Sequence, residues 1–250
     1  MLAEERFARI LQIGEGKRAV KVGELTELLG ISESTVRRDL TVLDEEGRLH
    51  KVHGGATALE GTFMAHDVDV SVKMNQNRDE KARIAAYAAA LVNENDFVYL
   101  DAGTTTDWMA EYLTEKKAVY VTNGISLAKK LAQRGFEAYI IAGRVKSTTE
   151  AVIGAAAAET LGRYNFTKGF FGTNGIDKKR GYTTPDIDEA RTKSEAMERC
   201  KRSYVLADPS KFSCISAVTF AKLQQAELIT TACKDNELKK IMTIWEVDRL

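Results

Sequence analysis

Cysteine is scarce in this 250-residue chain and follows no recognisable pattern. The three cysteines, Cys200, Cys214 and Cys233, are odd in number and widely separated. A disulfide framework uses an even set of cysteines, and a zinc site uses closely spaced ones. We therefore expect neither, and the composition fits a reducing cytosol.

The chain also lacks a membrane-spanning run, a signal sequence and a histidine cluster. No apolar run approaches the ~20 residues needed to cross a bilayer, and the acidic, amphipathic start differs from a signal peptide. His50, His53 and His66 form no plausible ligand set. We expect a cytoplasmic protein with no membrane association, no bound metal and no cofactor.

An excess of charge of either sign is missing as well. Lys and Arg together number 36, and Asp and Glu also number 36. Any affinity for DNA must therefore come from local placement of basic residues rather than from bulk charge. The length allows one small domain and one larger one.

Three short helices are expected near the start of the chain. Apolar periodicity predicts helices over residues 4–13 and 20–29. The inward residues of the second are expected to be Val22, Leu25, Leu28 and Leu29. Gly30 is suited to the C′ position that ends this helix, and Ser32 to the N-cap of a third.

The third helix has two chemically different faces. Val36, Leu40 and Leu43 recur at i, i+4 and i+7 and predict a buried face. The exposed start and face carry hydroxyls and arginines, namely Ser32, Ser34, Thr35, Arg37, Arg38 and Thr41. Arginine can pair bidentately with guanine, and hydroxyls can reach phosphates. We therefore expect this helix to enter the major groove of double-stranded DNA.

A basic, glycine-bearing segment follows at residues 48–56. Leu49 and Val52 are expected to face the core, and the outward residues to be Arg48, Lys51 and His53. This pattern predicts a β-hairpin wing along the phosphates, and hence a winged helix-turn-helix. A small three-helix bundle with a solvated arginine pair is the alternative. The agreement of turn, caps and wing favours DNA binding.

These residues resemble the amino-terminal signature of the DeoR family of bacterial transcriptional regulators. The matching positions are Arg6, Ile10, Ser32, Thr35-Val36-Arg37-Arg38-Asp39-Leu40, Gly47 and Val52-His53-Gly54-Gly55-Ala56. Gly14 is a departure, because the family usually has an aliphatic residue there. It is expected to end the first helix early without touching the recognition face.

The rest of the chain predicts a larger α/β domain. Helical periodicity is lost between residues 59 and 76, so we expect a DNA-binding domain at 1–57, a linker at 58–77, and an effector-binding and oligomerisation domain at 78–250. Expected strands are 97–100, 119–122, 138–141, 169–172, 204–207 and 228–231; expected helices are 81–92, 105–113, 126–133 and 189–200. This alternation indicates a mainly parallel sheet covered on both faces.

Polar turns follow several of these strands and predict a ligand site, because open α/β sheets bind ligands beyond the carboxyl ends of their strands. The candidate residues are Arg78, Lys81, Asp101, Gly103, Thr104, Thr105, Thr106, Thr122, Asn123, Gly124, Gly143, Arg144, Gly172, Thr173, Gly175, Lys193, Asp208 and Lys211. The turn at 101–106 is the preferred anion site, since free N–H groups and the dipole of the following helix favour phosphate.

Simpler interpretations stay open for several of these residues. The 101–106 turn could be an ordinary helix cap, and Arg78 and Lys81 could be a solvated helix start. Lys193 follows Glu189 at i+4, the spacing of an ordinary helix ion pair. Asp101 would repel a phosphate, so we expect it to hold a sugar hydroxyl or to cap the turn.

This second region also resembles the effector domain of the DeoR family. The motifs are Asp101-Ala102-Gly103-Thr104-Thr105, Thr122-Asn123-Gly124, Gly175-Ile176-Asp177 and Ala207-Asp208-Pro209-Ser210-Lys211-Phe212. The resemblance implies a fold similar to ribose-5-phosphate isomerase and control by a phosphorylated sugar. It also implies that the protein represses a carbohydrate operon, and members that respond to fructose 1-phosphate look closest.

Two other functions remain to be weighed. The larger domain could be a sugar-phosphate isomerase with Asp101 or Asp208 as base, or a phosphate-binding scaffold that never touches DNA. An isomerase has no need of a winged helix, and Arg37 and Arg38 argue against the scaffold. We therefore expect a homo-oligomeric regulator; the sugar, the operator, the sign of the response and the choice of dimer or tetramer are open.

Overall fold

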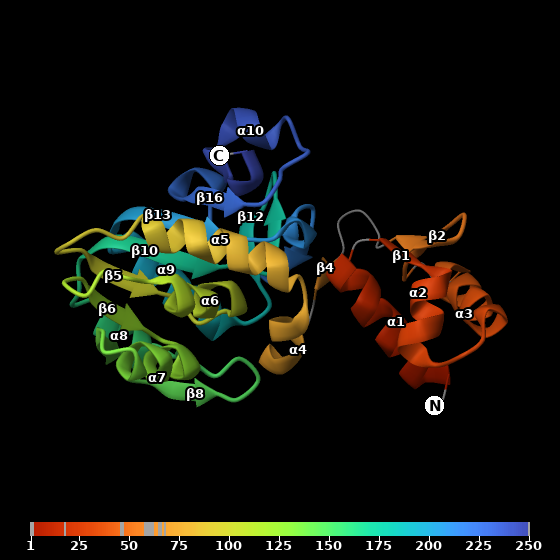
Figure 1. Ribbon diagram of the computed structural model, residues 1–250, viewed down its shortest axis with the longest axis horizontal. Helices are drawn as coiled ribbons and strands as arrows, with labels where there is room; N and C mark the ends of the chain where they lie inside the picture. Colours follow the sequence, from red (N-terminus) through yellow and green to blue (C-terminus); the bar gives the residue numbers. More distant parts are fainter. Residues whose placement is uncertain are drawn as a thin grey trace. The chain divides into compact units, whose positions relative to one another are not determined.

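The computed structural model describes residues 3–17, 19–45, 48–57, 63–64, 67 and 69–249. The motif glycine Gly47, His66 and most of residues 58–68 lie outside this part of the chain. The chain forms two compact units, residues 1–62 and 63–250 (Figure 1). None of the helices in the described part is long and apolar enough to span a bilayer.

The smaller unit is the expected winged helix-turn-helix. Its elements are α1 (Ala3–Lys17), β1 (Ala19–Lys21), α2 (Val22–Leu29), α3 (Glu33–Glu45), β2 (His50–Val52) and β3 (Gly55–Thr57). The strands form an antiparallel sheet in the order β1-β3-β2. Its core contains Ile10, Leu25, Val36, Leu40 and Leu43, all with no exposed surface. The predicted buried face of α3 is thus confirmed.

Glycines shape the two turns of this unit. Gly30 has φ 64° and donates its N–H to the carbonyl oxygen of Thr26 at 3.0 Å, so it ends α2 as predicted. Gly54, at the hairpin turn, has φ 82°. A Cβ on Gly55 would lie 2.1 Å from the carbonyl oxygen of Val20, because β1 and β3 pair closely there.

Three local expectations were wrong. α1 continues through Gly14, since one glycine costs only ~1 kcal/mol in a helix that packs elsewhere. Leu28 is 55% exposed, because Leu25 and Leu29 already cover the inner side of the eight-residue α2. Val52 is 43% exposed on the wing, where Leu49 and Ala56 reach the core instead.

Residues 19–21 form a strand rather than the first turn of the second helix. Val20 is buried and pairs with Ala56 of β3. Val20 is thus a buried residue between two exposed neighbours, the alternation that is typical of a strand. This alternation is hard to recognise in the sequence because α2 begins directly after Lys21.

The larger unit is built on seven parallel strands, which confirms the predicted sheet. They are β5 (Phe97–Leu100), β6 (Val119–Thr122), β7 (Glu137–Ile140), β10 (Phe166–Gly172), β13 (Cys200–Leu206), β16 (Glu227–Thr230) and β17 (Ile244–Glu246). Their order is β17-β16-β13-β10-β5-β6-β7. The chain runs outward from β5 in one direction and from β10 in the other, so the topological switch point lies between these two strands.

Helices cover both faces of this sheet (Figure 1). The unit's longer helices are α5 (Arg78–Ala90), α6 (Thr104–Tyr112), α7 (Ile125–Gln133), α8 (Ala155–Leu161) and α9 (Ile187–Glu198). Ile84, Met109 and Leu127, from the first three, share one core cluster. Leu161 and Ala190, from the other two, share a second cluster on the opposite face.

The sequence did not predict β17 or α8, and several short elements outside the parallel sheet were not predicted either. They are β8 (Arg144–Lys146) with β9 (Ala151–Ile153), β11 (Gly175–Asp177) with β12 (Gly181–Thr184) and β15 (Val218–Ala221), η1 (Pro209–Lys211), η2 (Leu223–Gln225), α10 (Leu238–Ile241) and η3 (Val247–Arg249). Most have four residues or fewer, too short for periodicity to reveal.

The expected linker is partly built into the larger unit. β4 (Phe63–Met64) pairs in parallel with β14 (Ile215–Ser216). α4 (Val70–Asn75) follows, capped by Asp69, whose side chain accepts from the N–H of Ser71 at 2.9 Å. A six-residue helix is too short to show helical periodicity, which explains why it was assigned to the linker.

Candidate DNA-binding surface and ligand pocket

The start of α3 carries a cluster of hydroxyls. Ser32 Oγ accepts from the N–H of Thr35 at 3.3 Å, as its predicted capping role requires. It also lies 2.9 Å from both Ser34 Oγ and Thr35 Oγ1. Ser34 is exposed and Thr35 half-buried, so this cluster presents polar groups to solvent at the end of the helix.

The two arginines of α3 differ in their surroundings. Arg37 pairs with Glu33 at 3.2 Å, one turn earlier. Arg38 is exposed and has no ion-pair or hydrogen-bond partner within the described ranges. Its guanidinium therefore retains its full donor set for an incoming base or phosphate.

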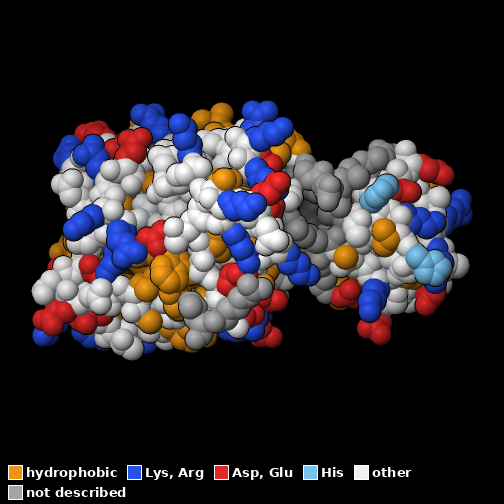
Figure 2. All heavy atoms as spheres, turned by 90° about the horizontal axis from the view of Figure 1, so that it is seen from above, with side chains coloured by type: hydrophobic (Ala, Val, Ile, Leu, Met, Phe, Trp, Pro, Cys, Tyr) orange, Lys and Arg blue, Asp and Glu red, His pale blue; other side chains and the backbone are white. Residues whose placement is uncertain are grey.

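Lys51 of the wing forms two hydrogen bonds with residues of α3. Lys51 Nζ donates to Thr41 Oγ1 at 2.6 Å, and the Lys51 N–H donates to Asp44 Oδ1 at 3.0 Å. The backbone bond from Lys51 is the main cause that lowers the pKa of Asp44. His53 is exposed beside the hairpin turn. Figure 2 shows acidic side chains among the basic and histidine side chains of this unit.

A buried ion pair explains two residues of the amino-terminal motif. Arg6 of α1 donates through Nε and an Nη to the two carboxylate oxygens of Asp39, at 2.8 and 3.0 Å. Asp39 is 3% exposed on the inner side of α3. This bidentate pair fixes α3 against α1 and leaves the outer side of α3 unobstructed.

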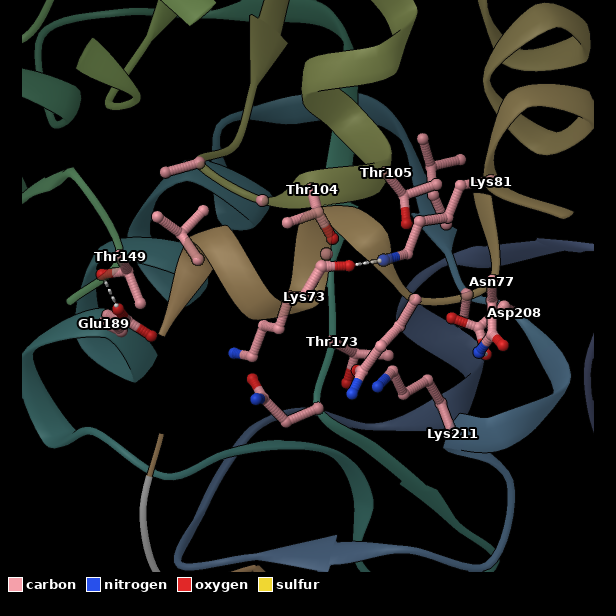
Figure 3. Close-up of a pocket in the computed structure, with 18 of the residues that line it drawn as sticks. Lys73, Asn77, Lys81, Thr104, Thr105, Thr149, Thr173, Glu189, Asp208 and Lys211 are labelled. Carbon is pink, nitrogen blue, oxygen red and sulfur yellow. Dashed lines mark hydrogen bonds between the residues drawn. The ribbon is translucent and has the colours of Figure 1, made fainter. Parts of the chain in front are cut away.

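A pocket lies at the carboxyl ends of β5, β10 and β13, where the switch point predicts one. Figure 3 shows Lys81 beside Thr104 and Thr105, with Asn77, Asp208 and Lys211 on one side and Thr149 and Glu189 on the other. The full lining is Val70, Lys73, Gln76, Asn77, Lys81, Ala102, Gly103, Thr104, Thr105, Thr149, Gly172, Thr173, Asn174, Glu189, Lys193, Leu206, Ala207, Asp208 and Lys211.

Half of the candidate residues from the sequence line this pocket. They are Lys81, Gly103, Thr104, Thr105, Gly172, Thr173, Lys193, Asp208 and Lys211. They come from three turns at strand ends, the first turn of α5 and the middle of α9, which the parallel sheet brings to one edge. In the described part of the chain, no group of three His, Cys, Asp or Glu side chains could hold a metal ion.

The amino end of α6 forms one wall. Gly103 is its N-cap residue, and Thr104 and Thr105 of its first turn line the pocket. Thr106 is fully buried and donates its hydroxyl to the carbonyl oxygens of Asp101 and Gly103, at 2.6 and 2.8 Å. The first N–H groups of a helix lack intrahelical acceptors, so this wall offers hydrogen-bond donors to an anion.

Lysines supply positive charge around this wall. Burial lowers the pKa of Lys81 to about 8, although Asp208 opposes that shift. Burial also lowers the pKa of Lys73, although Asp67 opposes that shift. Lys211 lowers the pKa of both lysines, because neighbouring ammonium groups repel one another. An anion bound among them would relieve this repulsion.

Asp208 is the buried acid of the pocket. Its Oδ1 accepts from Asn77 Nδ2 at 2.9 Å and from the Ser210 N–H at 3.0 Å. Burial opposes its ionisation, but Lys211 and the hydrogen bonds from Ser210 hold the pKa of Asp208 below its usual value. The carboxylate is therefore ionised and can accept from a ligand hydroxyl.

Asp101 does not line the pocket, contrary to the expectation that it holds a sugar hydroxyl. It is 1% exposed, and its Oδ2 accepts from Lys193 Nζ and from the Gly172 N–H, the latter at 2.9 Å. Burial raises the pKa of Asp101, although Lys193 opposes the shift. The proposed i,i+4 pair of Lys193 with Glu189 is wrong, because Lys193 turns to Asp101 instead.

The remaining candidate residues lie outside the pocket. Asn123 is buried, and its Oδ1 accepts from the Ala102 N–H at 2.7 Å, so it supports the turn from behind. The side-chain oxygen of Thr122 accepts a hydrogen bond from the Gly124 N–H at 3.0 Å. Arg144 is exposed and pairs with Asp188 at 2.8 Å. The others are Thr106, already described, Gly143 packed against β9, Gly175 in β11, and Arg78, 5.6 Å from the ring centre of Trp108.

Sequence reasoning missed ten lining residues: Val70, Lys73, Gln76, Asn77, Ala102, Thr149, Asn174, Glu189, Leu206 and Ala207. Ala102 and Asn174 stand within turns that were already suspected. From the sequence, Glu189 was considered as the i,i+4 partner of Lys193 and as a capping residue with Asp186, but not as part of the pocket. Its N–H does donate to Asp186 at 2.9 Å, but its carboxylate accepts from Thr149 at 2.7 Å and from Lys146 at 3.1 Å.

Both units match models of one family. Residues 6–62 match the DeoR-like helix-turn-helix domain, and residues 76–232 match the DeoR C terminal sensor domain. The uncharacterized HTH-type transcriptional regulator FruR of Bacillus subtilis (strain 168) is 43% identical over 236 residues, 94% of this chain and 93% of that protein. The lactose phosphotransferase system repressor of Streptococcus mutans serotype c is 32% identical over 251 residues, 99% of each.

Among solved structures, a ribose 5-phosphate isomerase from Methanocaldococcus jannaschii aligns at 16% identity over 55% of each chain, with a TM-score of 0.40. The relatives that match nearly the whole chain are transcriptional regulators and not enzymes, so the isomerase alternative falls. With both units matched in their expected order, the chain belongs to the DeoR family of transcriptional regulators.

Proposed function

We propose that this protein represses a carbohydrate-utilisation operon and that a phosphorylated sugar controls its affinity for the operator. The smaller unit binds double-stranded DNA through α3 and the wing, and the larger unit binds the sugar and forms the homo-oligomer. The observation that carries the proposal is the meeting of a helix amino end, Lys81 and Lys211 in one pocket. One relative is named a lactose phosphotransferase system repressor.

The phosphate belongs at the α6 end of the pocket. Gly103, Thr104 and Thr105 provide backbone and hydroxyl donors there, and Lys81 and Lys211 provide charge. A phosphate monoester carries a charge near −2 above pH ~6, which suits a site with two ammonium groups. A neutral sugar would bring no negative charge to these two ammonium groups.

The other polar groups of the pocket bind the hydroxyls of the sugar. Glu189 and Asp208 are buried carboxylates, and Asn174 and Thr173 are amide and hydroxyl neighbours. Buried carboxylates accept strongly from hydroxyls and repel a second anionic group. This arrangement favours a monophosphate over a bisphosphate.

The function requires coupling between two separate sites. If the effector changes operator affinity by some factor, operator DNA changes effector affinity by the same factor. A homodimer would place two recognition helices on a symmetric operator, and rearrangement within the oligomer would alter their spacing.

The test combines a binding screen with a response measurement. Thermal unfolding is followed with fructose 1-phosphate, glucose 6-phosphate, ribose 5-phosphate and unphosphorylated fructose. We expect one sugar phosphate to raise the unfolding temperature and fructose to leave it unchanged. Operator affinity is then measured with and without that compound.

At an effector concentration that just saturates the wild type, Thr105→Ala combined with Lys211→Ala should retain operator binding and lose the response, because the double variant binds the effector too weakly. Lys129→Ala, an exposed change on α7, is the control and should respond like the wild type. A double variant that still responds fully would show that the pocket has been assigned wrongly. If no sugar phosphate changes operator affinity, the proposed function itself is overturned.

A further inference from the structure

The connecting segment, defined here as Asp67 and residues 69–76, reaches into the pocket. Val70, Lys73 and Gln76 are pocket-lining residues. The helix-turn-helix model ends at residue 62 and the sensor model begins at 76, so residues 63–75 fall outside both. The chain that joins the DNA-binding unit to the sensor is therefore also part of the sensor's wall.

One buried acid links this segment to the pocket. Lys73 Nζ donates to Oδ1 of Asp67, and Lys146 Nζ donates to its Oδ2 at 3.0 Å. The side chains of Asp67 and Lys73 are 8% and 18% exposed. Although burial opposes ionisation, the two lysines hold the pKa of Asp67 below its usual value.

The two lysines are not equivalent. Lys146 also reaches Glu189 at 3.1 Å and Asp186 at 3.2 Å, so it has three acidic partners. Lys73 has only Asp67 as an ion-pair partner in the described part of the chain. Loss of Lys73 would leave Asp67 with Lys146, whereas an anion in the pocket would give Lys73 a new partner. The exchange therefore leaves neither charge unpaired.

The position of Lys73 suits such an exchange. It lines the pocket, and its backbone carbonyl oxygen accepts from Lys81 Nζ. Lys81 in turn lies at the proposed phosphate end (Figure 3). An anion drawn to Lys81 and Lys211 thus lies close to α4, where a doubly charged phosphate competes with a singly charged carboxylate.

On the basis of the proposed function, we propose that Lys73 is an effector-binding residue whose ammonium passes from Asp67 to the bound phosphate. Binding then removes one of the two cations that hold Asp67. Because Asp67 belongs to the chain that leads to the DNA-binding unit, the exchange is the step that carries the ligand signal out of the pocket. Lys211 contacts the same ligand but has no part in that step.

The test separates binding from response. The probe is fructose 1-phosphate, or whichever sugar phosphate of the panel binds the wild type, and both its Kd and the operator affinity at saturation are measured. Lys211→Gln should weaken binding at least tenfold, yet give the full wild-type response once saturated. Lys73→Gln should weaken binding similarly and give no response even when saturated.

Asp67→Asn is the complementary change. It removes the competing carboxylate and leaves Lys146 with two acids, so probe affinity should stay at the wild-type value or increase, while the response at saturation is lost. Lys73→Arg should recover part of both properties, and Lys129→Gln should match the wild type. Urea unfolding of each variant confirms that the unit is folded.

A full response by saturated Lys73→Gln, or wild-type probe affinity in that variant, overturns the inference. Either outcome holds whether or not Asp67→Asn folds, since the two variants are measured separately. If Lys211→Gln behaves as stated while Lys73→Gln resembles the wild type, the proposed function survives and only the role of Lys73 fails. If the wild type binds none of the sugar phosphates, both fail together.

Discussion

Lys193 of α9 donates a hydrogen bond to Asp101 at the end of β5, although 92 residues separate them in the chain. Their side chains are only 7% and 1% exposed. The second oxygen of Asp101 has no partner among the described residues. The pair joins a helix on one face of the sheet to the switch point, directly behind the pocket wall.

Breaking this pair should cost stability. Lys193→Met leaves the Asp101 carboxylate buried without its cation, and such changes cost ~3–5 kcal/mol. Adding Asp101→Asn removes the orphaned charge and should recover part of the loss. Urea unfolding measures both effects. As a control, Arg163→Ala breaks an exposed pair with Glu159 and should cost below ~1 kcal/mol; equal losses for both single variants would contradict the assignment.

Arg38→Ala should reduce specific operator binding more than non-specific binding. The exposed, unpaired guanidinium lies on the predicted recognition face, and a lost base contact costs ~1–3 kcal/mol. Affinity for operator and for unrelated DNA is measured at one fixed salt concentration. Arg163→Ala, in the larger unit, is the control. A ratio of specific to non-specific affinity that stays at the wild-type value argues against base contact by Arg38.

Lys51→Ala should weaken binding to all DNA sequences alike. If the wing contacts a phosphate, removing that contact lowers the slope of log affinity against log salt by about 0.9. Lys51 donates to Thr41 in the free protein, so Thr41→Val serves as a control that removes this hydrogen bond while keeping the charge. An unchanged slope in Lys51→Ala excludes the phosphate contact.

Effector affinity should fall as pH rises through about 8. Burial lowers the pKa of Lys81 to about 8, so its ammonium is lost above that pH, and a phosphate binds only the charged form. The fall approaches ~tenfold per pH unit for one linked proton. Lys81→Arg keeps its charge and should remove this dependence.

The same shift has a consequence for stability. The pKa of Lys81 is lower in the folded protein than its ordinary value of 10.5, so the folded state favours the neutral amine. The stability it contributes is present above pH 10.5 and is lost as pH falls through 8. Urea midpoints of the wild type and Lys81→Met between pH 7 and 10 test the sign.

Gly55→Ala should disrupt the wing, because its Cβ would lie 2.1 Å from the backbone oxygen of Val20. We expect a loss of several kcal/mol from the smaller unit and weaker operator binding. Gly14→Ala is the matched control: nothing lies within 4 Å of its Cβ, and alanine in a helix interior gains ~1 kcal/mol. Two variants of equal stability would refute the close approach.

The sequence predicts those helices and strands that are long enough for a pattern of apolar residues to be recognised. The buried face of α3 and six of the seven strands of the parallel sheet were anticipated, because their apolar residues recur over whole turns or fill whole strands; the three-residue β17 was not. α4 and the paired β4 and β14 were not, since six and two residues are too few to show a period. The boundaries at Gly14 and at residues 19–21 were misjudged because packing overrides local propensity.

The sequence predicts the part of the pocket that is formed by turns at the ends of strands. Gly103, Asp208 and Lys211 stand in such turns, so topology alone collects them. Lys73 and Thr149 lie in segments that only tertiary packing brings to the site, and neither has a sequence signal. Asp101 shows the opposite error: the position was correct, but its side chain turns inward to Lys193.

The spread of the pocket along the chain has a consequence for synthesis. α3 and the wing are complete by residue 57, but the pocket needs Lys211. At ~5–20 residues per second, roughly 8–30 s separate these points on the ribosome. During that interval a nascent chain carries a complete winged helix-turn-helix and an incomplete pocket.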